Sequence, residues 1–331
     1  MQKFAVRLID VSKWQYDKSK PPTLLPIVQA GFLGMLVRVG YGLVIDWAFA
    51  PFWKIAKQVK LSRIPYWYLD YYSHKGTGLT AYDWGVEQAG QCYDAVKADP
   101  GEAPLALDCE EFGGAWRITY LTRGDYNRVV KGFCEEWKRL TGKYPMIYCS
   151  LKFIWVFETW VRSLDLWLAW YTRNITKEQS IAGAREEKWQ GRILIWQYTS
   201  DGDIDDDADP DGLELGMGTD ALDLDGWLGT LAEFSAYCGT TPAPAPLPTP
   251  TPAPAPTPPA GTRYKVVARD GVNIRDVPKG MPGSDTIGWM PYGSIVDGKK
   301  AIAVGSDIWL KVTNWSVVAI RYNGVDLMAE V

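Results

Sequence analysis

The chain has 331 residues, a formal net charge of −4 and an apolar fraction of 47%. This length exceeds one average domain and the composition supports a full core, so we expect two globular domains. The chain lacks the dense positive charge that nucleic-acid binding requires, and no stretch approaches ~18 consecutive apolar residues, so nucleic-acid binding and membrane insertion are excluded.

Strand-like and helix-like segments alternate through the first part of the chain. A strand is predicted almost at once, with no apolar stretch long enough for a signal peptide before it. Short apolar runs predict strands over residues 4–9, 33–39, 64–69, 104–107, 145–148, 166–170 and 193–198. Helical spacing predicts helices over residues 51–59, 84–97, 123–141 and 151–161. This alternation predicts an α/β fold, and its length favours a (β/α) barrel over an open sheet.

Acidic residues stand at the ends of several predicted strands. Asp10 closes the first strand, Asp70 follows the third, and Asp108 and Glu110 close the fourth, while Asp223 lies in a late apolar motif. Residues two apart on a strand share a face, so Asp108 and Glu110 project side by side. Burial and mutual repulsion separate the pKa values of such a pair, as glycosidic bond cleavage requires. Taken alone, this pair also fits a strand that runs into a solvated acidic loop.

The composition changes completely over residues 240–261, which hold ten of the 22 prolines and no charge. Such a tract favours polyproline II and forms a semi-rigid spacer, so it predicts a domain boundary. A ligand for aromatic-lined grooves is the lesser alternative. Beyond it, residues 262–331 show alternating strands and glycine-rich turns, which predict a small all-β domain.

Histidine and cysteine are too few and too scattered for a metal site. The five cysteines lack paired metal-ligand spacing and mostly stand in apolar surroundings, which predicts reduced thiols instead of disulfides. The only histidine, His74, is expected on the surface. A zinc amidase or peptidase is therefore excluded, and no cofactor is expected.

Residues 4–230 resemble the lysozymes of glycoside hydrolase family 25, the Chalaropsis-type muramidases common among phage endolysins. The matching motifs follow the order of the family and lie at residues 10–15, 37–42, 65–68, 107–110, 144–148, 166–171, 195–199 and 222–227. The resemblance implies an irregular barrel that cleaves the β-1,4 bond between N-acetylmuramic acid and N-acetylglucosamine in peptidoglycan.

The resemblance also implies roles for individual residues. Glu110 would be the general acid and Asp108 its anionic partner, with Asp10 and Asp223 completing an acidic ring. Whether Asp108 attacks the sugar or steadies an attacking 2-acetamido group stays open; the resemblance favours the second, with retention of configuration.

Aromatic residues at the strand ends are candidates for sugar binding. They are Tyr66, Trp67, Tyr148 and Trp167, and core packing is an equal alternative for each. Two positions depart from the family pattern: Trp67 stands where a histidine is usual, and Asp225 where an asparagine is usual.

An acidic insertion at residues 201–212 places Asp207, Asp209 and Asp211 at the spacing of a calcium loop. The twelfth position is Gly218 instead of a bidentate glutamate. A solvated loop is therefore the favoured interpretation, with calcium binding as the alternative.

Residues 262–331 resemble a bacterial SH3-like domain, the small β-barrel often tethered to wall hydrolases. That resemblance implies binding of the cell wall, with Asn273, Arg275, Trp289 and Trp309 as candidate contacts. A core position for both tryptophans is an equal alternative.

The sequence thus predicts a catalytic barrel over residues 1–239, a linker over 240–261 and a wall-binding domain over 262–331. We expect a lysozyme that acts on peptidoglycan. The alternatives are a catalytically silent wall-binding protein on the same barrel and a hydrolase with chitinase-like specificity. Without a signal peptide, we expect a phage endolysin made in the host cytoplasm that meets the wall once the membrane is breached, or a bacterial enzyme exported by another route. The sequence does not specify an oligomeric state.

Overall fold

The computed structural model describes residues 4–18, 22–111, 118–119, 122–172, 175–200, 212–217, 219, 221–239, 263–269, 271–275, 286–297, 300–304, 307–313, 316–322 and 325–330. The chain forms two compact units, Met1–Pro242 and Ala243–Val331. The predicted domain bounds stay predictions.

A closed barrel forms the centre of the first unit. Eight of the nine strands of its sheet follow one another around the barrel, and the pairing of β1 with β2 closes it. These strands are β1 (Arg7–Val11), β2 (Phe32–Tyr41), β4 (Ser62–Tyr68), β5 (Ala106–Asp108), β6 (Met146–Ser150), β7 (Leu166–Ala169), β8 (Ile193–Thr199) and β9 (Asp223–Trp227). The short β3 (Val44–Ile45) forms a hairpin with β2.

One strand makes this barrel irregular. The strands from β1 to β8 pair in parallel around the ring, whereas β9 runs antiparallel to both of its neighbours, β8 and β1. The predicted α/β fold with an irregular barrel is confirmed.

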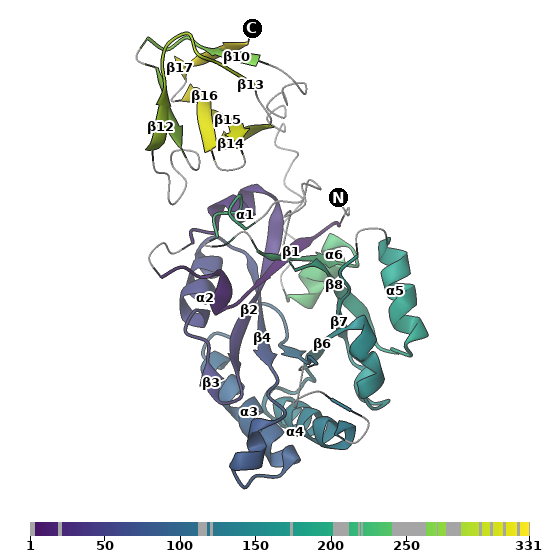
Figure 1. Ribbon diagram of the computed structural model, residues 1–331. Helices are drawn as coiled ribbons and strands as arrows, with labels where there is room; N and C mark the ends of the chain where they lie inside the picture. The colour runs from purple at the N-terminus through teal and green to yellow at the C-terminus, as the bar shows by residue number, and fades with distance from the viewer. Residues whose placement is uncertain are drawn as a thin grey trace. The chain divides into compact units, whose positions relative to one another are not determined.

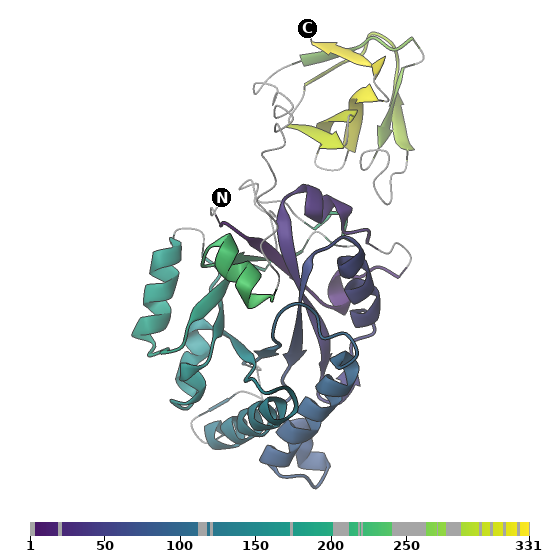
Figure 2. The ribbon, with the colours of Figure 1, turned by 180° about the vertical axis from the view of Figure 1, so that it is seen from behind.

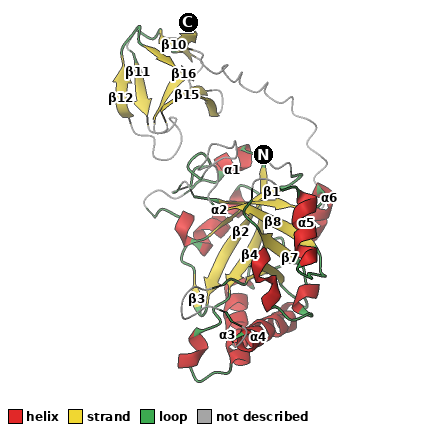
Figure 3. Cartoon of the chain, turned by 45° about the vertical axis from the view of Figure 1, so that its right-hand side comes forward, coloured by secondary structure: helices red, strands yellow, loops and turns green. Residues whose placement is uncertain are grey.

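Helices lie outside the barrel strands, as the red ribbons around the yellow arrows show in Figure 3 (see also Figure 1). They are α1 (Leu25–Gln29), α2 (Phe49–Gln58), α3 (Ala81–Val96), α4 (Arg123–Thr141), α5 (Lys177–Glu186) and α6 (Leu231–Tyr237). The bounds of α4 agree with the prediction because its apolar stripe ends at Gly142, which takes the left-handed conformation at φ +80°. Among the described residues, no helix combines the length and apolar character needed to cross a bilayer.

The helix predicted over residues 151–161 is wrong. Two short 3₁₀ segments stand there instead, η4 (Leu151–Val156) and η5 (Val161–Ser163). Aromatic and β-branched residues dominate this stretch and favour helix only weakly. Phe153, Ile154, Val156 and Phe157 are all buried, so tight turns replace a single amphipathic face.

Alternation along the strands separates two apolar layers. Residues such as Leu107 and Ile147 face outward to the helices, whereas Leu36, Ile64 and Ala106 face into the barrel. Helix α6, green in Figure 2, contributes Phe234 and Cys238 to the inner cluster. All five cysteines are free and buried.

The only histidine is buried, contrary to expectation. His74 lies in the 3₁₀ turn η2 (Ser73–Gly76) and is 9% exposed. Its Nδ1 is 2.8 Å from the carbonyl oxygen of Tyr71. The turn folds the ring back against its own backbone, which a polar sequence context does not predict.

In the second unit, every described element is a strand. They are β10 (Arg263–Val266), β11 (Val272–Arg275), β12 (Thr286–Met290), β13 (Ile295–Asp297), β14 (Lys300–Val304), β15 (Asp307–Thr313), β16 (Ser316–Tyr322), β17 (Val325–Asp326) and β18 (Met328–Glu330). The strands form two sheets around a small core that includes Val266, Leu310 and Val318. The all-β prediction is confirmed for these residues, and the SH3-like likeness stays a prediction.

Candidate active site

A cavity of about 390 Å³ opens at one end of the barrel. Its lining comes from the carboxyl ends of the parallel strands and from the start of the antiparallel β9. The lining residues are Asp10, Ser12, Trp14, Gln15, Arg38, Tyr66, Tyr68, Asp108, Glu110, Tyr148, Trp167, Tyr171, Gln197, Ser200 and Asp223. Four of the five acids noted at strand ends and in the late apolar motif therefore line one hollow: Asp10, Asp108, Glu110 and Asp223.

Strand alternation turns these side chains inward. Asp108 lies two residues beyond Ala106, which faces the barrel interior, and it pairs in register with Tyr68 on β4 and Tyr148 on β6. On the other side of the barrel, Asp10 of β1 pairs directly with Asp223 of β9. The barrel interior is thus apolar near the amino ends of the parallel strands and polar near their carboxyl ends.

Trp67 does not reach this cavity, and its predicted sugar contact is wrong. The ring is fully buried in the outer apolar layer, where its Nε1 lies 3.4 Å from Oε1 of Gln88. The cause is the two-residue period of a strand: Tyr66 and Tyr68 face the barrel interior, so Trp67 between them faces outward.

Asp70 also lies outside the cavity lining. Its Oδ1 accepts hydrogen bonds from the backbone N–H groups of Tyr72 and Ser73, at 2.9 and 3.1 Å. A carboxylate that satisfies two backbone donors in this way shapes a turn. Its position after a strand therefore reflects loop structure, and Asp70 does not join the other four acids.

The pKa values of the central acids are perturbed by burial. Asp108 is only 5% exposed, and burial, followed by the charges of Glu110 and Asp10, raises its pKa well above the usual range. Burial, followed by the charge of Asp10, raises the pKa of Glu110 to about 7. Near neutral pH the cavity therefore offers a protonated carboxyl beside other carboxyl groups, which is what general acid catalysis requires.

Asp10 is held by a polar network. The amide Nε2 of Gln197 donates to Oδ2 of Asp10 at 2.7 Å, and the hydroxyls of Tyr148 and Tyr171 each donate to Oε1 of Gln197 at 2.7 Å. Burial raises the pKa of Asp10 to about 6, and the hydrogen bond from Gln197 opposes that rise. This network fixes the orientation of Asp10 at the cavity floor.

Comparison with known proteins gives this site a family. The sequence model of Glycosyl hydrolases family 25 matches residues 9–207, more than half of the chain. The chain belongs to this family. The protein is thus a glycoside hydrolase, and the matched region contains Asp10, Asp108 and Glu110.

Solved structures show the same fold. A muramidase from Acremonium alcalophilum superposes with a TM-score of 0.51 at 15% identity, over 70% of this chain and 98% of that chain. A family 25 glycosyl hydrolase from Bacillus anthracis gives 0.51 at 16% identity, over 72% and 95%. A bacterial lysozyme from Streptomyces coelicolor gives 0.50 at 16% identity, over 70% and 96%. No curated protein matches the chain significantly.

A cation borders the acids of this family 25 barrel. The guanidinium of Arg38 contacts the buried Asp46, with Nε and Nη2 at 2.8 and 2.7 Å from Oδ2. Asp46 also accepts from the backbone N–H groups of Lys13 and Ala48, so the pair is firmly anchored. The charge of Arg38 lowers the pKa values of Asp10, Asp108 and Glu110, against the larger effect of burial.

The sequence prediction missed Arg38 and several other lining residues. Tyr68 is two residues beyond Tyr66, and Gln197 is two beyond Ile195, so strand periodicity alone was a usable signal. Arg38 stands between two valines in an apolar strand, which was also a signal. Trp14 lines the cavity and is 72% exposed. No sequence signal pointed to it beyond its place in a family motif.

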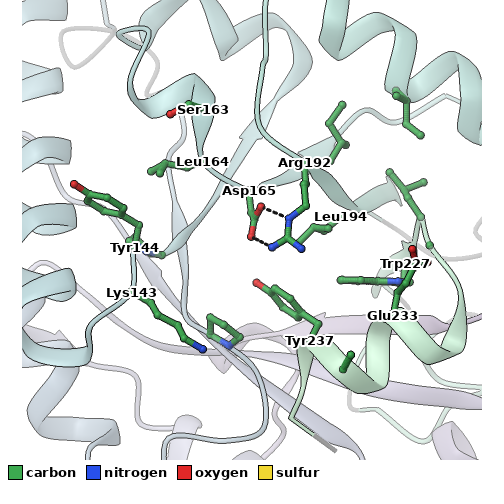
Figure 4. A pocket seen from close by; sticks show the side chains of 17 residues that line it. Lys143, Tyr144, Ser163, Leu164, Asp165, Arg192, Leu194, Trp227, Glu233 and Tyr237 are labelled. Carbon is green, nitrogen blue, oxygen red and sulfur yellow. Dashed lines mark hydrogen bonds and ion pairs between the residues drawn. The ribbon is translucent and has the colours of Figure 1, made fainter. Parts of the chain in front are cut away.

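A second and larger hollow, of about 830 Å³, lies at the opposite end of the barrel (Figure 4). Its lining includes the segments that precede β6, β7 and β8, such as Tyr144, Leu164 and Arg192. Asp165 makes a bidentate ion pair with Arg192, at 2.8 and 2.7 Å. Glu233 accepts from the backbone N–H of Thr230 at 2.7 Å. The acids here are already neutralised or bonded within the fold, so the smaller cavity is the better candidate for the glycosidase chemistry.

The predicted wall contacts in the second unit divide into two groups. Asn273 and Trp289 form a cross-strand pair, and Trp289 is 56% exposed; Arg275 is half-buried. Trp309 is only 2% exposed, so it packs in the core and its predicted surface contact is wrong. The candidate calcium residues Asp207, Asp209 and Asp211 lie outside the described residues.

Proposed function

We propose that this glycoside hydrolase cleaves the β-1,4 bond between N-acetylmuramic acid and N-acetylglucosamine in peptidoglycan. The observation that carries the proposal is the pair formed by the buried Asp108 and the half-buried Glu110 in one cavity, with the pKa of Glu110 raised to about 7. The names of the similar structures, a muramidase and a lysozyme among them, support peptidoglycan as the substrate.

Glu110 is the general acid in this mechanism. Its proton passes to the glycosidic oxygen as the bond from that oxygen to the anomeric carbon breaks. Positive charge then develops on the sugar ring, and the carboxylates of Asp108 and Asp10 stabilise it. Asp108 is ionised while Glu110 holds the proton, because after burial the charge of Glu110 is the main cause that raises the pKa of Asp108. The attacking group is either Asp108 or the 2-acetamido oxygen of the substrate, followed by water in both cases.

The aromatic residues of the cavity have two different roles, contact with the sugar and support of the contacting residues. Tyr66 and Tyr148 line the cavity while contacting Trp167, with ring centroids at 5.7 and 4.4 Å. Trp167 is 1% exposed and therefore supports the two tyrosines from below. We assign sugar contact to Tyr66 and Tyr148, with Asp223 completing the acidic ring at the rim.

Release of new reducing ends from purified peptidoglycan tests this function. We expect Glu110→Gln to lower the rate by about 10²–10⁴, the usual contribution of a general acid. The matched control is Glu111→Gln, which removes the same charge one residue away, at an exposed position outside the cavity lining. This control should retain the wild-type rate.

Two outcomes would favour the alternatives. If the wild type releases no reducing ends from walls of several bacteria at any pH, the protein is a silent wall-binding barrel. If it cleaves N-acetylglucosamine oligomers in preference to peptidoglycan, its specificity is chitinase-like.

The second unit and the route to the wall complete the proposal. We assign wall binding to the second unit, with the exposed pair Asn273 and Trp289 as its contact.

We also propose that the protein is a phage endolysin, made in the host cytoplasm. In that case, expression inside a bacterium should cause lysis only when the membrane is permeabilised; lysis without permeabilisation would favour export by another route.

A further inference from the structure

Asp225 lies directly beneath the catalytic acids, at a position that the proposed mechanism does not use. It is fully buried on β9, where it pairs with Leu8 of β1 and with Gln197 of β8. Its level in the barrel is one layer deeper than that of Asp10 and Asp223. A carboxyl group at this depth has no access to water, so its charge and hydrogen bonds must be satisfied by protein groups.

Hydrogen-bond donors reach only one of the two carboxyl oxygens of Asp225 within the described part of the chain. The indole Nε1 of Trp167 donates to Oδ1 of Asp225 at 2.7 Å. Oδ2 is buried and receives no hydrogen bond from a donor within the described part of the chain. An ionised carboxylate with one orphaned oxygen in a barrel interior is costly, and a proton on that oxygen removes the cost.

The neighbour of Asp225 is another carboxyl group. Asp225 pairs in register with Leu8, two residues before Asp10 on β1, and with Gln197, whose amide donates to Asp10. The two carboxyl groups are close enough for each to influence the pKa of the other. Two carboxylates are both acceptors, so they can share a hydrogen bond only when one of them carries a proton. A proton at this contact would also give the unpartnered Oδ2 of Asp225 a role.

Asp10 is the better site for the negative charge. It accepts from the amide of Gln197 and lies within the field of Arg38, and both favour its ionised form. Asp225 has the single donor Trp167. Burial, followed by the charges of Asp10 and Asp223, raises its pKa well above the usual range. Asp223 pairs with Asp10 across β1 and β9 but is only half-buried, so we place the proton on the deeper Asp225.

We propose that Asp225 is a positioning residue that acts as a neutral carboxylic acid: it keeps its own proton, donates a hydrogen bond through it to the carboxylate of Asp10, and so holds Asp10 ionised and oriented beneath the sugar. Asp10 is then clamped from two sides, by the amide of Gln197 and by the acid of Asp225. The inference rests on the proposed function for its catalytic consequence, because an ionised Asp10 is what stabilises the positive charge on the sugar.

Two substitutions test whether Asp225 acts as a hydrogen-bond donor or only fills space in the barrel. Asp225→Leu keeps the branched shape of the side chain but removes the donor, so we expect kcat/KM on peptidoglycan to fall by about 10–100-fold, as for other orienting partners. The acid limb of the pH profile should also move to higher pH, since Asp10 without this hydrogen bond ionises less readily. Asp225→Asn restores a donor that does not titrate, and should be at least about tenfold more active than Asp225→Leu.

A spectroscopic measurement does not depend on activity. In the full-length protein with ¹³C-labelled aspartate, infrared spectra at pH 8 should contain the C=O band of a protonated carboxylic acid that disappears in Asp225→Asn. The control Asp125→Asn, at an exposed ion pair on α4, should keep that band. If Asp225→Leu does not fold, this comparison still decides the matter.

The outcomes are distinguishable from failure of the proposed function. A wild type that releases no reducing ends but shows the Asp225 band would overturn the function and keep the proton assignment. Absence of a band difference between wild type and Asp225→Asn would overturn the inference. So would equal activity and equal pH limbs for Asp225→Asn and Asp225→Leu.

Discussion

At the residue scale, the pH dependence of the reaction follows from two perturbed carboxyl groups. Asp10 must be ionised and has a pKa raised to about 6, whereas Glu110 must be protonated and has a pKa raised to about 7. We therefore expect kcat/KM to follow a bell, falling below about 6 and above about 7. The limbs report the coupled cluster, not single residues. Rates that stay level from pH 4 to pH 9, measured by reducing-end release, would contradict the assignment.

The same carboxyl group that serves catalysis weakens the fold at alkaline pH. Burial raises the pKa of Glu110 from 4.5 to about 7, so the folded state binds this proton more tightly than the unfolded state. The stability it contributes is fully present below about pH 4.5 and is lost as the pH rises through about 7.

Replacing Glu110 with glutamine tests directly how much stability the ionised side chain removes at alkaline pH. At pH 8 we expect Glu110→Gln to raise the free energy of unfolding by about 1–2 kcal/mol, less than the full value of the shift because the side chain is partly open to solvent. At pH 4 the variant and the wild type should be equal. Urea unfolding at both pH values measures the difference, and a variant less stable than wild type at pH 8 would refute the pKa assignment.

At the element scale, helices α3 and α4 pack backbone against backbone. A Cβ atom added at Gly85 of α3 would overlap the carbonyl oxygen of Val129, and one at Gly132 of α4 would overlap that of Tyr82. Both overlaps involve main chain, which cannot swing aside as a flexible side chain does. These two glycines therefore set how closely the helices approach.

A matched pair of glycines in α3 tests this packing. Gly85→Ala should lower the free energy of unfolding by about 1–3 kcal/mol, although alanine is the better helix former. Gly90 lies in the same helix with no described atom within 4 Å of an added Cβ. Gly90→Ala should therefore raise the free energy of unfolding by about 0.5–1 kcal/mol. Urea unfolding of the two variants measures both effects, and equal values would show that helix propensity alone decides.

Sequence patterns predicted where helices and strands lie better than which side of a strand faces the cavity and which strands pair. Apolar runs located the strands because burial on both sides requires them, and Gly142 located the end of α4. Choosing Trp67 beside Tyr66 was an error of face, since neighbouring residues on a strand point to opposite sides and Tyr66 and Tyr68 both face the cavity. The direction of β9 has no signature in its five residues.

The candidate site shows the same division. Asp10, Asp108 and Glu110 were predictable because they close apolar strands, and Asp223 because it lies in a late apolar motif, all of which are local properties. Gln197 was missed because its role depends on a hydrogen bond to Asp10, 187 positions away in the chain. Asp225 stood out only as a departure from a motif, and its burial beneath Asp10 required the pairing of β9 with β1.

At the scale of the whole molecule, the two units should separate catalysis from attachment. Removal of residues 243–331 should leave the rate on soluble muropeptide oligomers within about twofold of wild type, because the barrel has its own core. Lysis of whole cell walls should fall by about tenfold or more, because tethering raises the effective concentration at the wall. Turbidity clearing and reducing-end assays measure the two rates, with the melting temperature of the truncated protein as control. Equal losses on both substrates would contradict a separate binding role.

The pairing of β9 with β1 has a consequence for synthesis on the ribosome. The barrel is completed only when residues 223–226 pair with residues 7–10, so one of the earliest segments to emerge waits for the last strand of the first unit. Until then the nascent chain has an open sheet edge and an incomplete set of acids. Each newly made molecule is thus unable to cut glycan until its barrel is nearly finished, and a messenger truncated before this strand yields no partially active product.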